Sequence, residues 1–215
     1  MRYGESIFDI GYLLFAIILG FKMASCPEKS GKYMGFATLV LGFGDAFHLI
    51  PRVLNYFLSS DFTVALGIGK LITSITMTVF YILVYRVWLG VYGEKENKKL
   101  SICLYVIAII RILLCLMPQN NWTGNESPME WGIIRNIPFL VIGMIVIMLY
   151  FKKRYDNKIL SLIWLYVLLS FLFYIPVATA ASFFPKLGML MLPKTVCYML
   201  IVWSFYKYCQ DSVKT

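Results

Sequence analysis

Long apolar segments alternate with short polar links along the whole chain. Seven segments approach the roughly 20 residues that a helix needs to cross the hydrocarbon core of a bilayer. The second and sixth are long and contain Pro51 and Pro176, which predict tilted or kinked helices. We therefore expect one all-α domain, residues 1–215, that forms a bundle of seven transmembrane helices, at residues 6–23, 33–57, 62–88, 100–117, 131–151, 159–183 and 188–207.

The composition agrees with this pattern and limits the chemistry. Of the 215 residues, 60% are hydrophobic and only 14% are charged, which is typical of a polytopic membrane protein. The five cysteines form no CxxC or CxxH pair, and the chain has a single histidine, so we expect no metal site and no disulfide. The sequence also lacks a phosphate-binding glycine loop, a nucleophile elbow and an HExxH motif. We expect no cofactor.

The links divide sharply by charge. Only Arg2 and Lys186 lie on the side of the N-terminus, whereas thirteen of the twenty basic residues lie on the other side. The positive-inside rule then places the N-terminus outside and the C-terminus inside. Five acidic residues share the basic side and leave it at +8, close to the whole net charge of +9. Contact with anionic membrane lipids accounts for this charge, so no nucleic-acid partner is needed. The thirteen residues are Lys22, Lys29, Lys32, Arg86, Lys95, Lys98, Lys99, Lys152, Lys153, Arg154, Lys158, Lys207 and Lys214.

The other five basic residues fall inside the apolar segments. With a rise of about 1.5 Å per residue, all of them lie in the outer half of the membrane or near its midplane. Charged groups at this depth are costly and usually face the bundle interior or a watery cavity. We therefore predict a basic cavity that opens to the outer face. Its candidate residues are Arg52, Lys70, Arg111, Arg135 and Lys194, with Asp9, Asp45 and His48 at the same level.

The segment 39–57 concentrates the candidate chemistry. Asp45, His48 and Arg52 are spaced i, i+3 and i+7, so they share one helix face. Asp45 and His48 have the spacing of an acid–base pair, but Asp45 could equally join a buried polar network with Lys70 or Arg111. The arginines suit either the binding of phosphate or carboxylate groups, or snorkelling to lipid phosphates. Five further polar residues are candidates to line the cavity: Asn55, Thr73, Thr76, Tyr174 and Thr179.

Three functions fit these features. The leading one is a multi-pass protein of the plasma membrane that binds a small anionic or amphiphilic ligand in the basic cavity, for transport or for sensing. The first alternative is a membrane-embedded hydrolase that acts on lipid headgroups, with Asp45 and His48 activating water. The second alternative is a structural membrane subunit whose charges pair with one another. The sequence predicts no oligomeric state.

Overall fold

A computed structural model describes residues 2–58, 60–124, 128–180 and 184–212, and within these ranges the regular secondary structure is entirely helical. Two short 3-10 helices, η1 (Pro118–Asn120) and η2 (Pro185–Leu190), lie in the links. Six α-helices are long and apolar enough to cross a membrane, whereas α6 has a shorter apolar stretch, Ile163–Thr179. The α-helices are α1 (Arg2–Ala24), α2 (Lys29–Phe57), α3 (Thr63–Tyr92), α4 (Lys98–Leu116), α5 (Met129–Lys152), α6 (Ile163–Ala180) and α7 (Met191–Ser212).

The seven predicted segments correspond to the seven α-helices, which confirms the all-α fold. The bounds differ by a few residues; α6, for example, begins at Ile163 where the pattern predicts residue 159. Asn157 explains the delay, because its Oδ1 accepts hydrogen bonds from the backbone N–H groups of Ile159 and Leu160, at 2.9 and 3.1 Å. Such a side-chain bond stabilises a turn in place of helix. The predicted end of this segment, residue 183, lies outside the described residues.

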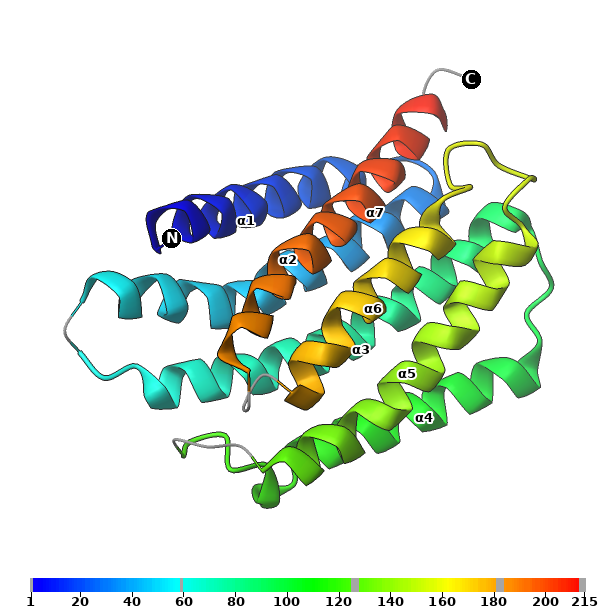
Figure 1. Ribbon diagram of the computed structural model, residues 1–215. Coiled ribbons are helices and arrows are strands. Elements are labelled where there is room, and N and C mark those ends of the chain that lie inside the picture. The colour runs from blue at the N-terminus through cyan, green and yellow to red at the C-terminus, as the bar shows by residue number, and fades with distance from the viewer. Residues whose placement is uncertain (1, 59, 125–127, 181–183, 213–215) are drawn as a thin grey trace.

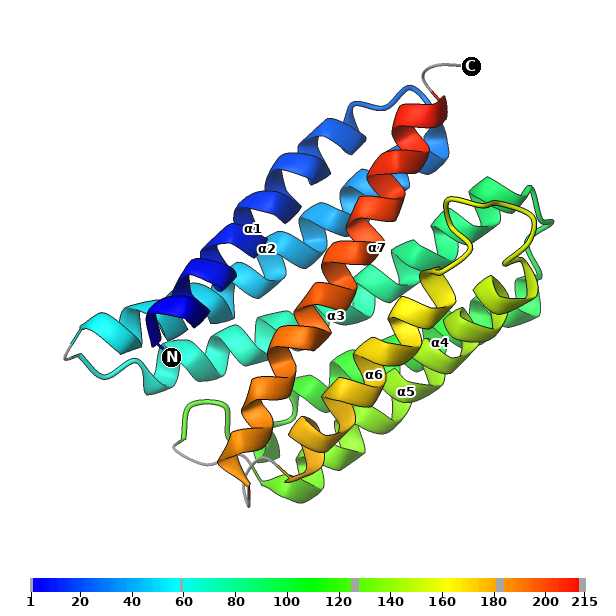
Figure 2. The same ribbon diagram turned by 45° about the horizontal axis from the view of Figure 1, so that its top comes forward.

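The helices form a ring in chain order, in which each helix is antiparallel to the next (Figure 1 and Figure 2). The ring closes where α7 packs against α1 and α2, and inside it α3 contacts α5. One end of the bundle, the N-terminal end, holds the N-terminus and the links α2–α3, α4–α5 and α6–α7. The other, the C-terminal end, holds the C-terminus and the remaining links. Residues equally far from these ends therefore share a level in the bundle.

Basic residues concentrate at the C-terminal end. Twelve of the thirteen that the sequence assigns to one side are described there, and Lys214 lies outside the described residues. Part of this charge is paired across links, since Arg86 contacts Glu96 at 3.2 Å and Lys153 contacts Glu94 at 2.9 Å. Hydrogen bonds to Glu94 and to Asp156 raise the pKa of Lys153 to about 12. The Lys153–Glu94 pair connects the α5–α6 link to the α3–α4 link, and the Arg86–Glu96 pair connects α3 to the link that follows it.

Aromatic side chains fill the centre of the bundle. The ring of Tyr81, on α3, lies edge-on to Phe139 of α5 at 5.2 Å between centroids and also contacts Phe171 of α6, at 5.5 Å. Its hydroxyl group lies 3.4 Å from those of Ser170 and Tyr198, on α6 and α7. Packing and hydrogen bonds of this kind hold helices together in a membrane, where lipid is as apolar as the helix surface. Tyr81 thus joins four helices.

The backbones of helices α2 and α3 lie close together beside a proline. Helix α2 continues through Pro51, which has no N–H to donate to the carbonyl group of Phe47. Gly69 of α3 lies against this carbonyl and against the Cα atom of His48, and a Cβ atom at position 69 would overlap both. The missing side chain therefore lets α3 pack where the hydrogen-bond ladder of α2 is open. This contact fixes the position of His48 relative to α3.

We predict that Gly69→Ala destabilises the protein by about 1–3 kcal/mol, because the added methyl group has no space between two backbones. Thermal unfolding of the purified protein in detergent measures the effect. Gly11→Ala is the matched control, since nothing lies within 4 Å of a Cβ atom at that position. Equal melting temperatures for the two variants would show that the α2–α3 contact does not need a glycine.

Candidate functional site

A cavity of about 360 Å³ lies between α2, α3, α4, α5, α6 and α7, towards the N-terminal end of the bundle. At a rise of about 1.5 Å per residue, its lining cations are within about 11 Å of their helix ends, and His48 is about 14 Å from the end of α2. The structure thus brings together five of the eight predicted site residues, each from a different helix: His48, Lys70, Arg111, Arg135 and Lys194.

Arg111 is the most deeply buried of the cations, with 2% of its surface exposed. Its guanidinium group lies over the ring of Phe139, 3.5 Å from the centroid, and Nη1 donates a hydrogen bond to Oγ1 of Thr78 at 2.7 Å. A desolvated cation–π contact contributes about 2 kcal/mol or more. Nε is buried and makes no hydrogen bond to any residue that the structure describes. The guanidinium group is thus held by an aromatic ring and a neutral hydroxyl group rather than by a carboxylate.

Lys194 occupies a similar environment near the start of α7. Its Nζ atom lies 4.7 Å from the ring centroid of Tyr174 and 5.5 Å from that of Tyr198. Tyr174 is held in place, because its hydroxyl group donates to Oδ1 of Asn136 at 3.0 Å. Lys194 also interacts electrostatically with Asp45 of α2. Aromatic faces therefore surround this second cation as well.

The α4–α5 link folds back to form one wall of the cavity. Arg135 donates from Nη1 to Oδ1 of Asn120 at 2.7 Å, and its guanidinium group lies 4.4 Å from the ring centroid of Trp122. The indole N–H of Trp122 donates to the carbonyl group of Cys115 at 2.8 Å. On the far side, the Trp122 carbonyl group abuts Gly67, where a Cβ atom would overlap it. The link is thereby docked onto α3.

Lys70 and His48 form the side of the cavity next to the α2–α3 contact. Lys70 is exposed, and its backbone carbonyl group accepts a hydrogen bond from Ser74 at 2.8 Å. Thr73 donates to the carbonyl group of Gly44 on α2 at 3.0 Å and ties the two helices together. Nδ1 of His48 is buried and has no hydrogen-bond partner within the described ranges. It is the only histidine in the chain, and it lies among the described lining residues.

The charge of the cavity is its most unusual property. No acidic side chain occurs among its described lining residues. Nor do Lys70, Arg111 or Lys194 take part in a salt bridge with a described residue. Burying a cation such as Arg111 without a counterion is expensive. Aromatic faces and neutral hydrogen-bond acceptors offset part of that cost and leave the charge available.

The other three predicted site residues lie apart, along the contact between α1 and α2. Asp45 accepts a hydrogen bond from the hydroxyl group of Tyr12 at 2.7 Å, and Arg52 lies 3.7 Å from Glu5. Asp9 is buried and lines a separate apolar hollow of about 230 Å³. Unlike the cavity, this α1–α2 contact combines its basic residue with acidic ones. Arg52 is therefore neutralised where the cavity cations are not.

The i, i+3 spacing of Asp45 and His48 suggests a contact between their side chains, but the structure gives Asp45 a different partner. The described residues show no hydrogen bond between the two side chains, and Asp45 is oriented by Tyr12. Of the five further candidates, Thr73 and Tyr174 line the cavity, while Asn55, Thr76 and Thr179 are not among its described lining residues. Phe139, Trp122 and Tyr198, which face the cations, carry no signal in one sequence that separates them from core aromatic residues.

In comparisons with known proteins, no family model, curated protein or solved structure matches this chain. Within the described part of the chain, no group of three or more His, Cys, Asp or Glu side chains is arranged to hold a metal ion. A functional assignment therefore depends on the geometry and chemistry of the cavity.

Proposed function

We propose that this protein binds a small anionic or amphiphilic ligand in the cavity, for transport or for sensing. One observation carries the proposal: Lys70, Arg111 and Lys194 line a single cavity whose described lining residues include no carboxylate. An anion that enters would act as the counterion of these cations. Its binding would therefore be stabilised by a Coulomb attraction that no residue of the cavity lining provides. The guanidinium group of Arg111 suits phosphate or carboxylate oxygens, and the lysines act as point charges.

The lining also favours a ligand with an apolar part. Met77, Phe139, Val177 and Met191 share the cavity wall with the cations. Small-molecule sites are usually apolar with a few well-placed polar groups, and their volumes are about 300–1,000 Å³. A volume of about 360 Å³ therefore fits one small amphiphile or a compact polar anion.

The proposed orientation follows from the charge at the two ends. The positive-inside rule places the basic C-terminal end in the cytoplasm and the mouth of the cavity outside the cell. All seven helices, including the shorter α6, would then cross a plasma membrane whose anionic inner lipids face the basic end. The ligand would reach the cavity from the outer face.

We predict that Lys70→Gln weakens the binding of octyl phosphate by about 10–100-fold, the loss of one charge-assisted hydrogen bond. Isothermal titration of the purified protein in neutral detergent measures this affinity. Lys158→Gln, which removes an exposed lysine at the C-terminal end, is the matched control and should bind as the wild type does. Inorganic phosphate and octyltrimethylammonium separate the contributions of the headgroup and the chain.

Two results would contradict the proposal. One is equal affinity of the Lys70 and Lys158 variants for octyl phosphate, which would place the binding outside the cavity. The other is equal affinity of the wild type for octyl phosphate and octyltrimethylammonium, which would show that the charge of the ligand is not recognised.

A membrane-embedded hydrolase is the second candidate, and the position of His48 favours it. The buried, unpartnered Nδ1 of this residue shares the cavity with cations that would stabilise developing negative charge. The structural-subunit alternative has less support, because Lys70, Arg111 and Lys194 form no salt bridge with an acidic side chain in the described part of the chain.

For the hydrolase, we predict that His48→Gln lowers turnover by about 10²–10⁴-fold, the usual contribution of a general base. The assay measures by mass spectrometry the soluble headgroups that are released from mixed phospholipid vesicles containing the protein. Octyl phosphate binding by the variant should stay near that of the wild type, because the cations remain. A wild type without turnover, or a variant with full turnover, would exclude this mechanism.

A further inference from the structure

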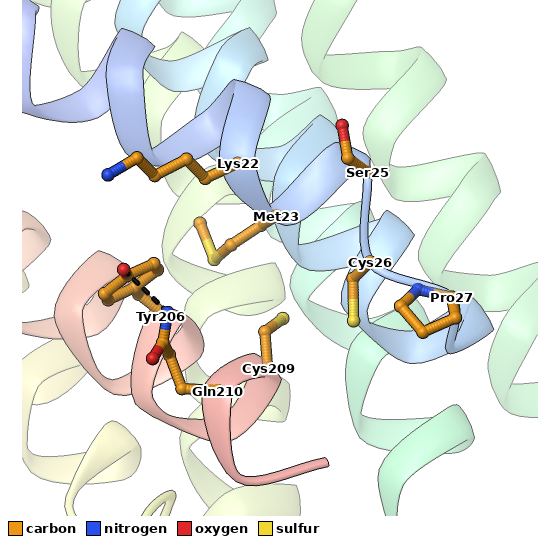
Figure 3. Close-up of a pocket in the computed structure, with 8 residues that line it drawn as sticks. All are labelled: Lys22, Met23, Ser25, Cys26, Pro27, Tyr206, Cys209 and Gln210. Carbon is orange, nitrogen blue, oxygen red and sulfur yellow. Dashed lines mark hydrogen bonds between the residues drawn. The ribbon is translucent and has the colours of Figure 1, made fainter. Parts of the chain in front are cut away.

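A second hollow, of about 670 Å³, lies at the C-terminal end of the bundle (Figure 3). It is formed by the end of α1, the turn between α1 and α2, and the last turns of α7. Figure 3 shows the side chains of Met23, Cys26 and Cys209 around the same space, with their sulfur atoms directed towards it. Lys22 lies on the rim.

The two thiols are close together although 183 positions separate them in the sequence. The place that a Cβ atom of Gly31 would occupy lies 2.5 Å from Sγ of Cys26 and 3.0 Å from Sγ of Cys209. The two sulfur atoms are therefore no more than about 5.5 Å apart, the sum of these distances. Both cysteines are free, and both are buried.

Two methionines complete a sulfur-rich cluster. Sδ of Met34, on α2, lies 3.8 Å from Sγ of Cys209 and is fully buried. Met23, on α1, is 1% exposed and lines the hollow. Two sulfur ligands that each lie about 2.3 Å from one metal ion, at a trigonal or tetrahedral angle, are about 3.8–4.0 Å apart. The Cys209–Met34 separation already has this value.

We propose that Cys26, Cys209 and Met34 bind Cu(I), with Met23 as a neighbouring thioether. Thiolate and thioether sulfur are soft ligands that favour Cu(I), whereas Zn²⁺ sites use cysteine and histidine. On binding, each of the two thiols releases a proton to solvent, so the Cu(I) dithiolate carries a charge of −1 and no redox step is involved.

No sequence motif marks this site, because its ligands follow no metal-binding spacing. Cys26 lies in a turn, Met34 on the next helix and Cys209 near the end of the last one. Methionine is also absent from the ligand types that ordinary spacing motifs use. The site is independent of the basic cavity, which lies at the opposite end of the bundle.

The test is a titration of the full-length protein, reduced and free of oxygen, with Cu(I) in competition with the coloured chelator bicinchoninate. The wild type should take up one equivalent of Cu(I). Cys26→Ser and Cys209→Ser should each weaken the affinity by more than the roughly 10–100-fold that is typical of losing an outer-shell partner. Cys103→Ser, which alters an exposed cysteine on α4, is the matched control and should bind as the wild type does.

A further variant distinguishes the loss of a metal ligand from the loss of the fold. Met34→Leu keeps both thiols and nearly the same volume, so it should melt close to the wild type while its Cu(I) affinity falls. No uptake of Cu(I) by the wild type overturns the proposal, as does equal uptake by the Cys26, Cys209 and Cys103 variants. A preference for Zn²⁺ over Cu(I) in the same competition overturns it too, because it would show that the thioether is not a ligand.

Discussion

The position of Arg111 over the ring of Phe139 is the contact on which the rest of the cavity depends. It keeps a buried cation in place without a carboxylate, at 3.5 Å from the ring centroid. The same ring packs against Tyr81 and Tyr174, so the aromatic centre that joins the helices also supports the charge. Tyr174 in turn lies beside Lys194. Stability of the bundle and the positive potential of the cavity therefore come from one set of side chains.

The intramembrane charges separate into two environments with different consequences. Between α1 and α2, Arg52 lies beside Glu5, and Asp45 accepts a hydrogen bond from Tyr12, so both of these charges have a polar partner. Across α4 and α7, Arg111 and Lys194 lie against aromatic rings and form no salt bridge with a described residue, although Lys194 also interacts electrostatically with Asp45. Since an unpaired buried cation is costly, such an arrangement favours an outside anion. If only stability mattered, the paired charges between α1 and α2 would contribute more to it than the cations of the cavity do.

The sequence was sufficient to predict the helices and the distance of the cations from the helix ends, because hydropathy predicts the former and the rise per residue the latter. It could not group the charges, since the face that each helix presents depends on packing. The contact of Gly69 with the open carbonyl group of Phe47 holds α2 against α3, and in this packing His48 lines the cavity while Asp45 is not among its described lining residues. The aromatic partners and the Cys26–Cys209 pair are equally products of tertiary packing, invisible to any local pattern.

Native mass spectrometry of the gently purified protein tests the central claim most directly. The account predicts a bound anion or anionic amphiphile of one discrete mass on the wild type, absent from Arg111→Ala. It should be retained by Arg154→Ala, whose arginine also lies over an aromatic ring, Phe151 at 3.9 Å, but at the other end of the bundle. An empty wild type would contradict the account. The same mixture of lipids on all three proteins would also contradict it, because it would show that the cations of the cavity bind no specific ligand.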